Sequence, residues 1–100
     1  MKLTCLQKDL KSALDITSLA VNTSNTLPVL SNIFLKASNK KLYFSATNLE
    51  IAINFSIPAD IKNEGSITIP AKLITNYVSF LEDKEVEMRV ETANTLQLKS

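Results

Sequence analysis

The chain contains no histidine and no tryptophan, and it has only one cysteine and one glycine among its 100 residues. The absence of histidine removes the commonest general base and excludes most zinc sites. The lone cysteine, Cys5, cannot form an internal disulfide or a thiolate metal cluster, and no histidine is present to activate it as a nucleophile. A single glycine, Gly65, cannot build a phosphate-binding loop or a dinucleotide fingerprint. These absences make an enzyme the weakest function hypothesis, and we expect no cofactor.

Long hydrophobic runs are absent as well. No apolar stretch approaches the roughly 18 residues of a membrane-spanning helix, and the first residues, MKLTC, lack the apolar stretch of a signal peptide. Hydrophobic residues make up 45% and charged residues 21% of the chain, which is ordinary for a globular domain. We therefore expect one cytoplasmic domain without a membrane partner, and a lone thiol agrees with that compartment.

The net charge of +1 is too small to identify the whole chain as a nucleic-acid binder. Residues 1–50 carry six lysines and three acids, a charge of +3, whereas residues 51–100 carry five basic and seven acidic residues, a charge of −2. Five of these acids lie from residue 82 to residue 91. The distribution fits a charge-segregated surface and scattered solvated charge equally well.

A short strand, an amphipathic helix and a run of alternating strands occur twice along the chain. In the first copy the patterns predict a strand at residues 2–6, a helix at residues 7–22 and strands at residues 32–37, 42–47 and 51–57. In the second copy they predict a strand at residues 66–69, a helix from Pro70 to about residue 82, and strands at residues 85–91 and 95–98. Neither copy can bury its own apolar face, so we expect the two copies to share a core.

The predicted fold class is therefore α+β, with two helices packed on one face of a mostly antiparallel sheet, in one domain of residues 1–100. Residues 38–41 are predicted to form a turn and residues 59–65 a polar loop. The second copy stops before a strand that would match the third strand of the first copy. We expect the domain to be truncated before this last strand.

The second predicted helix has an apolar and a polar side. Its predicted apolar face consists of Leu73, Ile74, Tyr77, Val78 and Leu81. Its polar stripe consists of Lys72, Thr75, Asn76 and Ser79. Hydroxyls, an amide and one cation at helical spacing suit phosphate oxygens, which position a protein on DNA without reading its sequence. An ordinary solvated helix face has the same composition, and spacing alone favours that simpler interpretation.

Three sequence strings narrow these hypotheses. TLPVLSN at residues 26–32 follows the first helix, ATNLEI at residues 46–51 joins two strands, and ITIPAK at residues 67–72 opens the second helix. In this order and spacing, and together with the opening MKLT, they closely resemble the N-terminal domain of the bacterial DNA polymerase III β subunit, the β sliding clamp. Each string alone is weakly specific, but the ordered set is strongly specific, and the resemblance covers essentially the whole chain.

The resemblance implies a ring with a DNA-clamp fold. Subunits of this family have three domains of similar fold, and two subunits close head to tail around double-stranded DNA, with helices lining the hole and sheets forming the outer wall. The ring has no catalytic activity and tethers the replicative polymerase to DNA as a processivity factor in DNA replication. This chain would supply the first domain of a homodimeric ring, whose second and third domains, absent here, carry the contacts with the polymerase and the clamp loader.

The resemblance also assigns roles to residues. In the family, a basic residue directly after the Pro-Ala that opens the second helix contacts DNA, and here that residue is Lys72. A family arginine in the loop after the first helix corresponds to Ser24, which can hydrogen-bond a phosphate but carries no charge. Helical spacing alone, and not the resemblance, predicts further DNA-facing residues on the two helices: Lys8, Lys11, Thr75, Asn76 and Ser79. The family's subunit contact implies interface residues on the second helix and the last strand: Leu73, Leu96 and Leu98.

An alternative hypothesis remains open at this point. A stand-alone α+β module could bind a protein partner through a free sheet edge and have no role on DNA, because an unpaired edge strand invites pairing with another strand.

Overall fold

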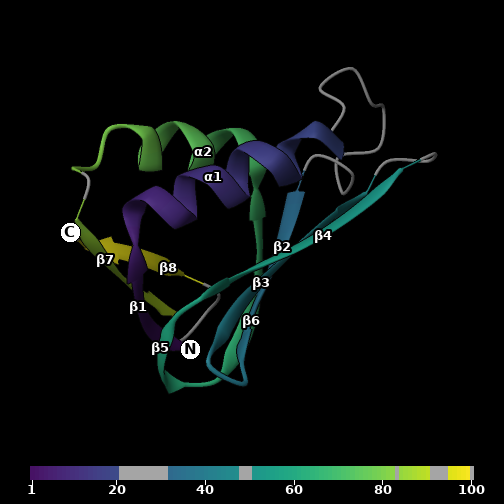
Figure 1. Ribbon diagram of the computed structural model, residues 1–100. Helices are drawn as coiled ribbons and strands as arrows, with labels where there is room; N and C mark the ends of the chain where they lie inside the picture. The colour runs from purple at the N-terminus through teal and green to yellow at the C-terminus, as the bar shows by residue number, and fades with distance from the viewer. Residues whose placement is uncertain (21–31, 48–50, 83, 91–94, 100) are drawn as a thin grey trace.

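Two helices lie side by side above two antiparallel β-sheets (Figure 1). The computed structural model describes residues 1–20, 32–47, 51–82, 84–90 and 95–99. No helix in this part of the chain is long and apolar enough to cross a membrane. The described elements, in chain order, are β1 (Lys2–Leu6), α1 (Gln7–Thr17), the 3-10 helix η1 (Ser18–Ala20), β2 (Asn32–Ser38), β3 (Lys41–Thr47), β4 (Ala52–Pro58), β5 (Asp60–Asn63), β6 (Gly65–Pro70), α2 (Ala71–Ser79), β7 (Glu85–Val90) and β8 (Leu96–Lys99).

The described strands are divided between two four-stranded sheets. Sheet A has the order β5-β1-β7-β8 and sheet B the order β4-β3-β2-β6, and every neighbouring pair is antiparallel. The predicted α+β class, with two helices over antiparallel strands, is confirmed. The strands form two sheets where the sequence predicted one, because alternation shows that a strand is half-buried but does not specify its partners.

The two copies of the repeated unit exchange their first strands. Strand β1 of the first copy pairs with β7 of the second copy in sheet A, and β6 of the second copy pairs with β2 of the first copy in sheet B. Each sheet is therefore built from both copies. This exchange confirms the prediction that the copies share a core, since each sheet contains strands of both copies.

The chain passes from sheet B to sheet A between β4 and β5. Residues 59–65 were predicted to be a polar loop, and this prediction is wrong, because residues 60–63 form β5 and pair with β1. Strand β5 is an edge strand of sheet A, and only Ile61 among its four side chains is partly buried. A strand that buries one side chain shows almost no apolar alternation, which explains why the sequence pattern missed it.

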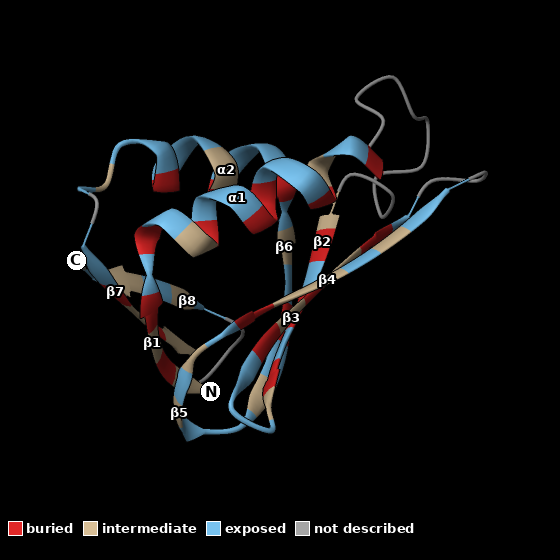
Figure 2. Cartoon of the chain, in the orientation of Figure 1, coloured by how far each residue is buried: buried red, intermediate tan, exposed pale blue. Residues whose placement is uncertain are grey.

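The core fills the space between the helices and the two sheets, where the buried positions of all layers face one another (Figure 2). On α1 the buried apolar residues recur at three- and four-residue spacing, and on β2 and β3 they alternate. The largest buried side chains come from both helices and both sheets: Leu3, Leu10, Leu14, Ile33, Leu35, Leu42, Phe44, Val78, Val86 and Met88. The helices are therefore fixed against both sheets.

The helices end earlier than the sequence predicted. Helix α1 ends at Thr17 and continues as η1 to Ala20, and residues 21 and 22 lie outside the described ranges. Pro70 was predicted to open the second helix, but its ψ of 128° is extended, and it ends β6 opposite Asn32. Its ring still suits the position directly before the helix, because a proline has no N–H to leave unpaired there.

Two local backbone features lie at the hairpin end of sheet B. Asn39 and Lys40 connect β2 and β3 with φ values of 52° and 61°, which confirms the predicted turn and matches the two-residue hairpin turn whose twist suits antiparallel strands. Gly65 begins β6 against the N-terminus, where an added Cβ would lie 2.9 Å from Met1 Cβ and 3.2 Å from Met1 Cα. Only glycine allows this close approach without displacing the backbone of Met1.

Candidate nucleic-acid interface

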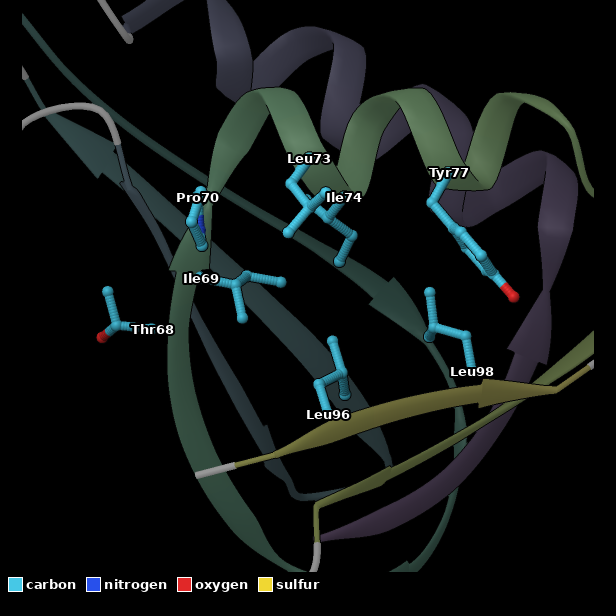
Figure 3. Close-up of a pocket in the computed structure, with 8 residues that line it drawn as sticks. All are labelled: Thr68, Ile69, Pro70, Leu73, Ile74, Tyr77, Leu96 and Leu98. Carbon is cyan, nitrogen blue, oxygen red and sulfur yellow. The ribbon is translucent and has the colours of Figure 1, made fainter. Parts of the chain in front are cut away.

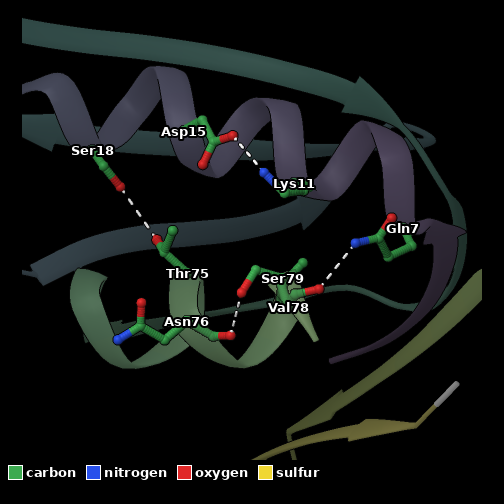
Figure 4. A network of polar contacts seen from close by, with 8 residues as sticks. All are labelled: Gln7, Lys11, Asp15, Ser18, Thr75, Asn76, Val78 and Ser79. Atoms are coloured by element: carbon green, nitrogen blue, oxygen red, sulfur yellow. Dashed lines mark hydrogen bonds and ion pairs between the residues drawn. The ribbon is translucent and has the colours of Figure 1, made fainter. Parts of the chain in front are cut away.

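The two helices run antiparallel, and polar contacts at both ends of the pair join them (Figure 4). The Gln7 side chain, at the start of α1, donates from Nε2 to the Val78 carbonyl oxygen at the end of α2 over 2.9 Å. The Ser18 and Thr75 hydroxyl oxygens lie 3.3 Å apart where α1 has ended and α2 begins its second turn. The helix pair therefore presents one joined surface on the side away from the sheets.

Lys72 occupies the first turn of α2, directly after the buried Ala71 that anchors the helix on the core. Its side chain is exposed and forms no ion pair with any residue in the described ranges. The full positive charge is therefore available to a phosphate. The structure places this residue on the helix surface where the sequence predicted it.

The two lysines of α1 differ in their charge environment. Lys11 Nζ lies 3.0 Å from Asp15 Oδ2, one helical turn away, and both side chains are about half exposed. Lys8 is exposed and has no ion-pair partner in the described part of the chain. Lys11 contributes less net positive charge than Lys8 or Lys72, because Asp15 offsets it, although such exposed pairs are weak.

The polar residues of α2 predicted to face DNA do not all point the same way. Asn76 and Ser79 are exposed, and the Ser79 hydroxyl donates to the Asn76 carbonyl oxygen over 2.7 Å (Figure 4). Thr75 is half-buried and turned toward Ser18 of the first helix, so it belongs to the seam between the helices. The Asn76 side-chain amide has no hydrogen-bond partner among the described residues, whereas the hydroxyls of Thr75 and Ser79 have contacts within the protein.

The helix surface has little charge of either sign. Three lysines and two aspartates give α1 and α2 together a net charge of +1. The structure groups Lys8, Lys11, Lys72, Asn76 and Ser79 on the exposed sides of one helix pair. Ser24, the predicted loop contact, lies outside the described residues.

A second candidate region is an apolar groove between α2, β6 and β8, with a volume of about 510 Å³ (Figure 3). Leu73 and Tyr77 extend from α2 at its rim, and Leu96 and Leu98 project toward them from β8 (Figure 3). Leu73 is 69% and Tyr77 50% exposed, so the predicted apolar face of this helix was too wide. Ile74 and Val78 are the buried residues of that face, Leu81 is partly buried, and Leu73 and Tyr77 border the groove. The three predicted interface leucines are therefore brought together.

The thiol of Cys5 is a chemically reactive group outside both candidate regions. Burial in β1, together with the negative charge of Asp9, raises its pKa to about 12. The thiolate is the nucleophilic form, so this cysteine is inert at neutral pH. No group of three or more residues suited to hold a metal ion occurs among the described residues.

Gln7 is the residue of this region that the sequence analysis missed. Its side chain is 6% exposed and its only recognisable sequence signal is a polar residue at the start of a helix. Its partner is a backbone carbonyl 71 residues away, which no local pattern can indicate.

Comparison with known proteins identifies the family. The profile of the DNA polymerase III beta subunit, N-terminal domain, matches residues 1–100. The beta sliding clamp of Synechocystis is 41% identical over 93 residues, which cover 91% of this chain and 24% of that protein.

Solved structures agree with this assignment. The DNA polymerase sliding clamp of Caulobacter crescentus has a TM-score of 0.92 and 36% identity, covering 99% of this chain and 27% of that one. The sliding clamp of Bacillus subtilis has a TM-score of 0.95 and 26% identity, covering 100% of this chain and 28% of that one. The chain thus spans about a quarter of the length of these relatives. By sequence and by fold, this chain belongs to the DNA polymerase III beta subunit family, the beta sliding clamps, and corresponds to their N-terminal domain.

Proposed function

We propose that this chain forms the first domain of a ring that encircles double-stranded DNA and tethers the replicative polymerase during DNA replication. The observation that carries the proposal is the exposed helix pair, which offers an unpaired Lys72 among small polar side chains. The helices would line the hole and the sheets would form the outer wall. The protein would act in the cytoplasm as a non-catalytic processivity factor, and its polymerase and clamp loader would bind through other domains of the complete subunit.

The composition of the helix surface suits sliding. Each phosphate that a protein neutralises adds about −0.9 to the slope of log affinity against log salt, so a few lysines attract DNA without holding it in place. The residues that we propose face DNA, Lys8, Lys11, Lys72, Asn76 and Ser79, include no aromatic side chain for stacking and no arginine for bidentate base contacts. Such contacts are indifferent to sequence, which is what movement along DNA requires.

The repeat symmetry of the fold supports a larger domain. In the first copy, β4 pairs with β3 and packs under α1, whereas in the second copy the corresponding edge of β8 has no strand beside it among the described residues. The apolar groove lies at this edge, next to α2. We propose that a further strand pairs with β8 in the complete domain, and that two more domains follow in the subunit.

The same region is our candidate for the contact between subunits. Leu73 is exposed at the rim of the groove, and Leu96 and Leu98 form its floor. Exposed apolar surface of this kind is typical of subunit contacts. Two subunits joined in this way would close a homodimeric ring.

The experiment is a salt titration of DNA binding with the complete gene product and its Lys72→Ala variant. We expect the variant to lower the salt slope by about 0.9 and to weaken attraction equally on DNA of any sequence. Lys62→Ala is the matched control, since Lys62 lies on β5 in sheet A and not on the helix surface, with its Nζ 3.4 Å from Asp60 Oδ2. A loss confined to one DNA sequence would contradict sliding.

Encirclement is tested by topology. We expect the complete gene product to be retained on nicked circular DNA and to be lost from linear DNA of the same length. Equal retention on both substrates would refute the ring. It would also favour the alternative of a stand-alone interaction module, which the family assignment otherwise makes the weaker hypothesis.

A further inference from the structure

The face of sheet B that points away from the helices has an unusual composition. In an antiparallel sheet, residues directly opposite each other share a face, so the register places Phe34 beside Thr68 and Ser45, and Lys36 beside Ser66 and Tyr43. We call these residues and their neighbours on β4 the outer face of sheet B. Its members are Asn32, Phe34, Lys36, Ser38, Lys41, Tyr43, Ser45, Thr47, Ala52, Asn54, Ser56, Pro58, Ser66, Thr68 and Pro70.

Two aromatic rings stand on the two central strands of this face. Phe34 on β2 is 40% exposed, and Tyr43 on β3 is partly exposed. Because Phe34 lies opposite Ser45, Tyr43 is its diagonal neighbour, and such neighbours are roughly 7–8 Å apart. The rest of the outer face consists mainly of residues with hydroxyl and amide groups. The two rings are therefore surrounded by polar side chains and are not part of a large apolar patch.

The charge of the outer face has one sign. None of its fifteen residues is an aspartate or a glutamate; Lys36 lies opposite Tyr43, and Lys41 lies at the hairpin end. The carboxylate of Glu64 lies at the hairpin end of the sheet, where it accepts a hydrogen bond from the Asn39 backbone N–H over 3.2 Å. A polyanion could therefore cross the middle of the face without meeting a carboxylate.

Two shallow hollows on this face adjoin each other. One, of about 270 Å³, borders Phe34 and Thr68, and the other, of about 550 Å³, borders Tyr43 and Ser56. Both are lined by Ser45 and Asn54, whose side chains share a hydrogen bond of 2.7 Å from the serine hydroxyl to the amide oxygen. The two hollows therefore meet at Ser45 and Asn54, and each borders one of the rings.

We propose that the outer face of sheet B binds single-stranded DNA. One base stacks on Phe34 and another on Tyr43, Lys36 contacts a phosphate, and the hydroxyl and amide groups contact the sugar-phosphate backbone. Stacking on aromatic platforms beside a cation is the general mode of single-strand binding, and four-stranded sheets with aromatic residues on their surface use it. The choice of DNA over RNA rests on the proposed function, since stacking alone does not distinguish them.

The test measures binding of fluorescein-labelled dT12 to the complete gene product by anisotropy at low salt. Phe34→Thr and Tyr43→Thr keep a residue suited to a strand, and each should weaken binding about 5- to 100-fold. Phe34→Tyr retains a ring and should bind as tightly as the parent protein. Phe80→Thr removes an aromatic side chain that is 88% exposed beyond the end of α2, and it should leave dT12 binding unchanged.

The outcomes separate this inference from the proposed function. We expect Lys36→Ala to lower the salt slope for dT12 by about 0.7 and to leave the slope for duplex DNA unchanged, and Lys72→Ala to do the reverse. The inference is overturned if dT12 does not bind, if neither threonine variant weakens binding, or if only the matching RNA, rU12, binds. None of these results would affect the duplex measurements with Lys72→Ala.

Discussion

Replacing Gln7 with methionine tests how the two helices are held together. The Gln7 amide is buried, and it donates to the Val78 carbonyl oxygen over 2.9 Å, so it connects the first turn of α1 with the last turn of α2 (Figure 4). Methionine has a similar length and no donor. The substitution therefore removes the hydrogen bond while keeping most of the packing.

The magnitude follows from what remains at the carbonyl. The Val78 oxygen also accepts the Leu81 backbone N–H over 3.1 Å, so the loss of Gln7 does not leave a buried acceptor unpaired. The cost is then one net hydrogen bond, about 1 kcal/mol of unfolding free energy, and not the larger cost of an unsatisfied buried group. For a chain of 100 residues this corresponds to a decrease in Tm of roughly 4–8 °C.

A second substitution makes the same contact depend on pH. In Gln7→Glu a carboxylate would face the Val78 carbonyl oxygen in a buried site, so the folded-state pKa of the new side chain lies above its unfolded value of about 4.3. The contribution of this group to stability is therefore fully present below that value and is lost as the pH rises through the folded-state pKa. We expect this variant to be less stable at pH 7 than at pH 4, relative to the parent protein.

Urea denaturation followed by far-ultraviolet circular dichroism measures both variants. Lys8→Met is the matched control, because it introduces the same side chain at the next, exposed position, and it should change stability by less than about 0.5 kcal/mol. A loss above about 3 kcal/mol in Gln7→Met would show that Val78 has no second partner. No loss at all would show that the contact does not join the helices.

Three further predictions test other features of the fold. Gly65→Ala should destabilise the chain by about 1–3 kcal/mol in urea denaturation, since its Cβ would meet Met1 Cβ at 2.9 Å, and an unchanged midpoint would contradict the close approach. Lys40→Gly should stabilise it by about 0.5–1 kcal/mol, because φ of 61° strains a lysine and Asn-Gly is the preferred pair in this turn; a lower Tm would refute this. The pKa of Cys5 is about 12 in the folded state against 9.0 for an unperturbed thiol, so this group favours folding below pH 9 and the benefit is lost as the pH rises from 9 to 12. Cys5→Ala should remove that part of the pH dependence, and rapid alkylation of the native thiol at pH 8 would contradict its burial.

The sequence predicted the parts of the fold that are governed by local periodicity. The apolar spacing of α1 and the alternation in β2 and β3 match their buried positions, because one face of each element meets the core. The pairing of β1 with β7 and of β6 with β2 could not be predicted, since it joins strands far apart in the chain. Strand β5 was missed because only one of its four side chains is partly buried, which leaves no apolar alternation.

In the candidate site, too, local patterns predicted some features, whereas features that depend on tertiary packing were not predicted. Lys72 was proposed because it matches the family's basic residue after Pro-Ala, and the structure exposes its side chain in the first turn of α2. Thr75 was placed on the exposed stripe by spacing, yet it contacts Ser18, because the neighbouring helix covers that side of α2. Which side of a surface helix meets a second helix depends on tertiary packing, and a single helical period contains no information about it.

The exchange of first strands between the two copies gives a physical reason why the proposed DNA-binding surface could act with few cations. Because β1 belongs to sheet A and β6 to sheet B, each helix follows a strand that is paired with the other copy, and neither helix can shift without disturbing both sheets. The Gln7–Val78 contact then fixes the helices to each other. In the proposed ring, a small number of cations is enough to attract DNA, because the helices that carry them are already fixed in place. Binding then does not have to offset a free-energy cost of ordering the helix surface. Loosening the helix pair by Gln7→Met should therefore weaken attraction to duplex DNA even though Gln7 itself is buried, and unchanged attraction would show that the surface need not be rigid.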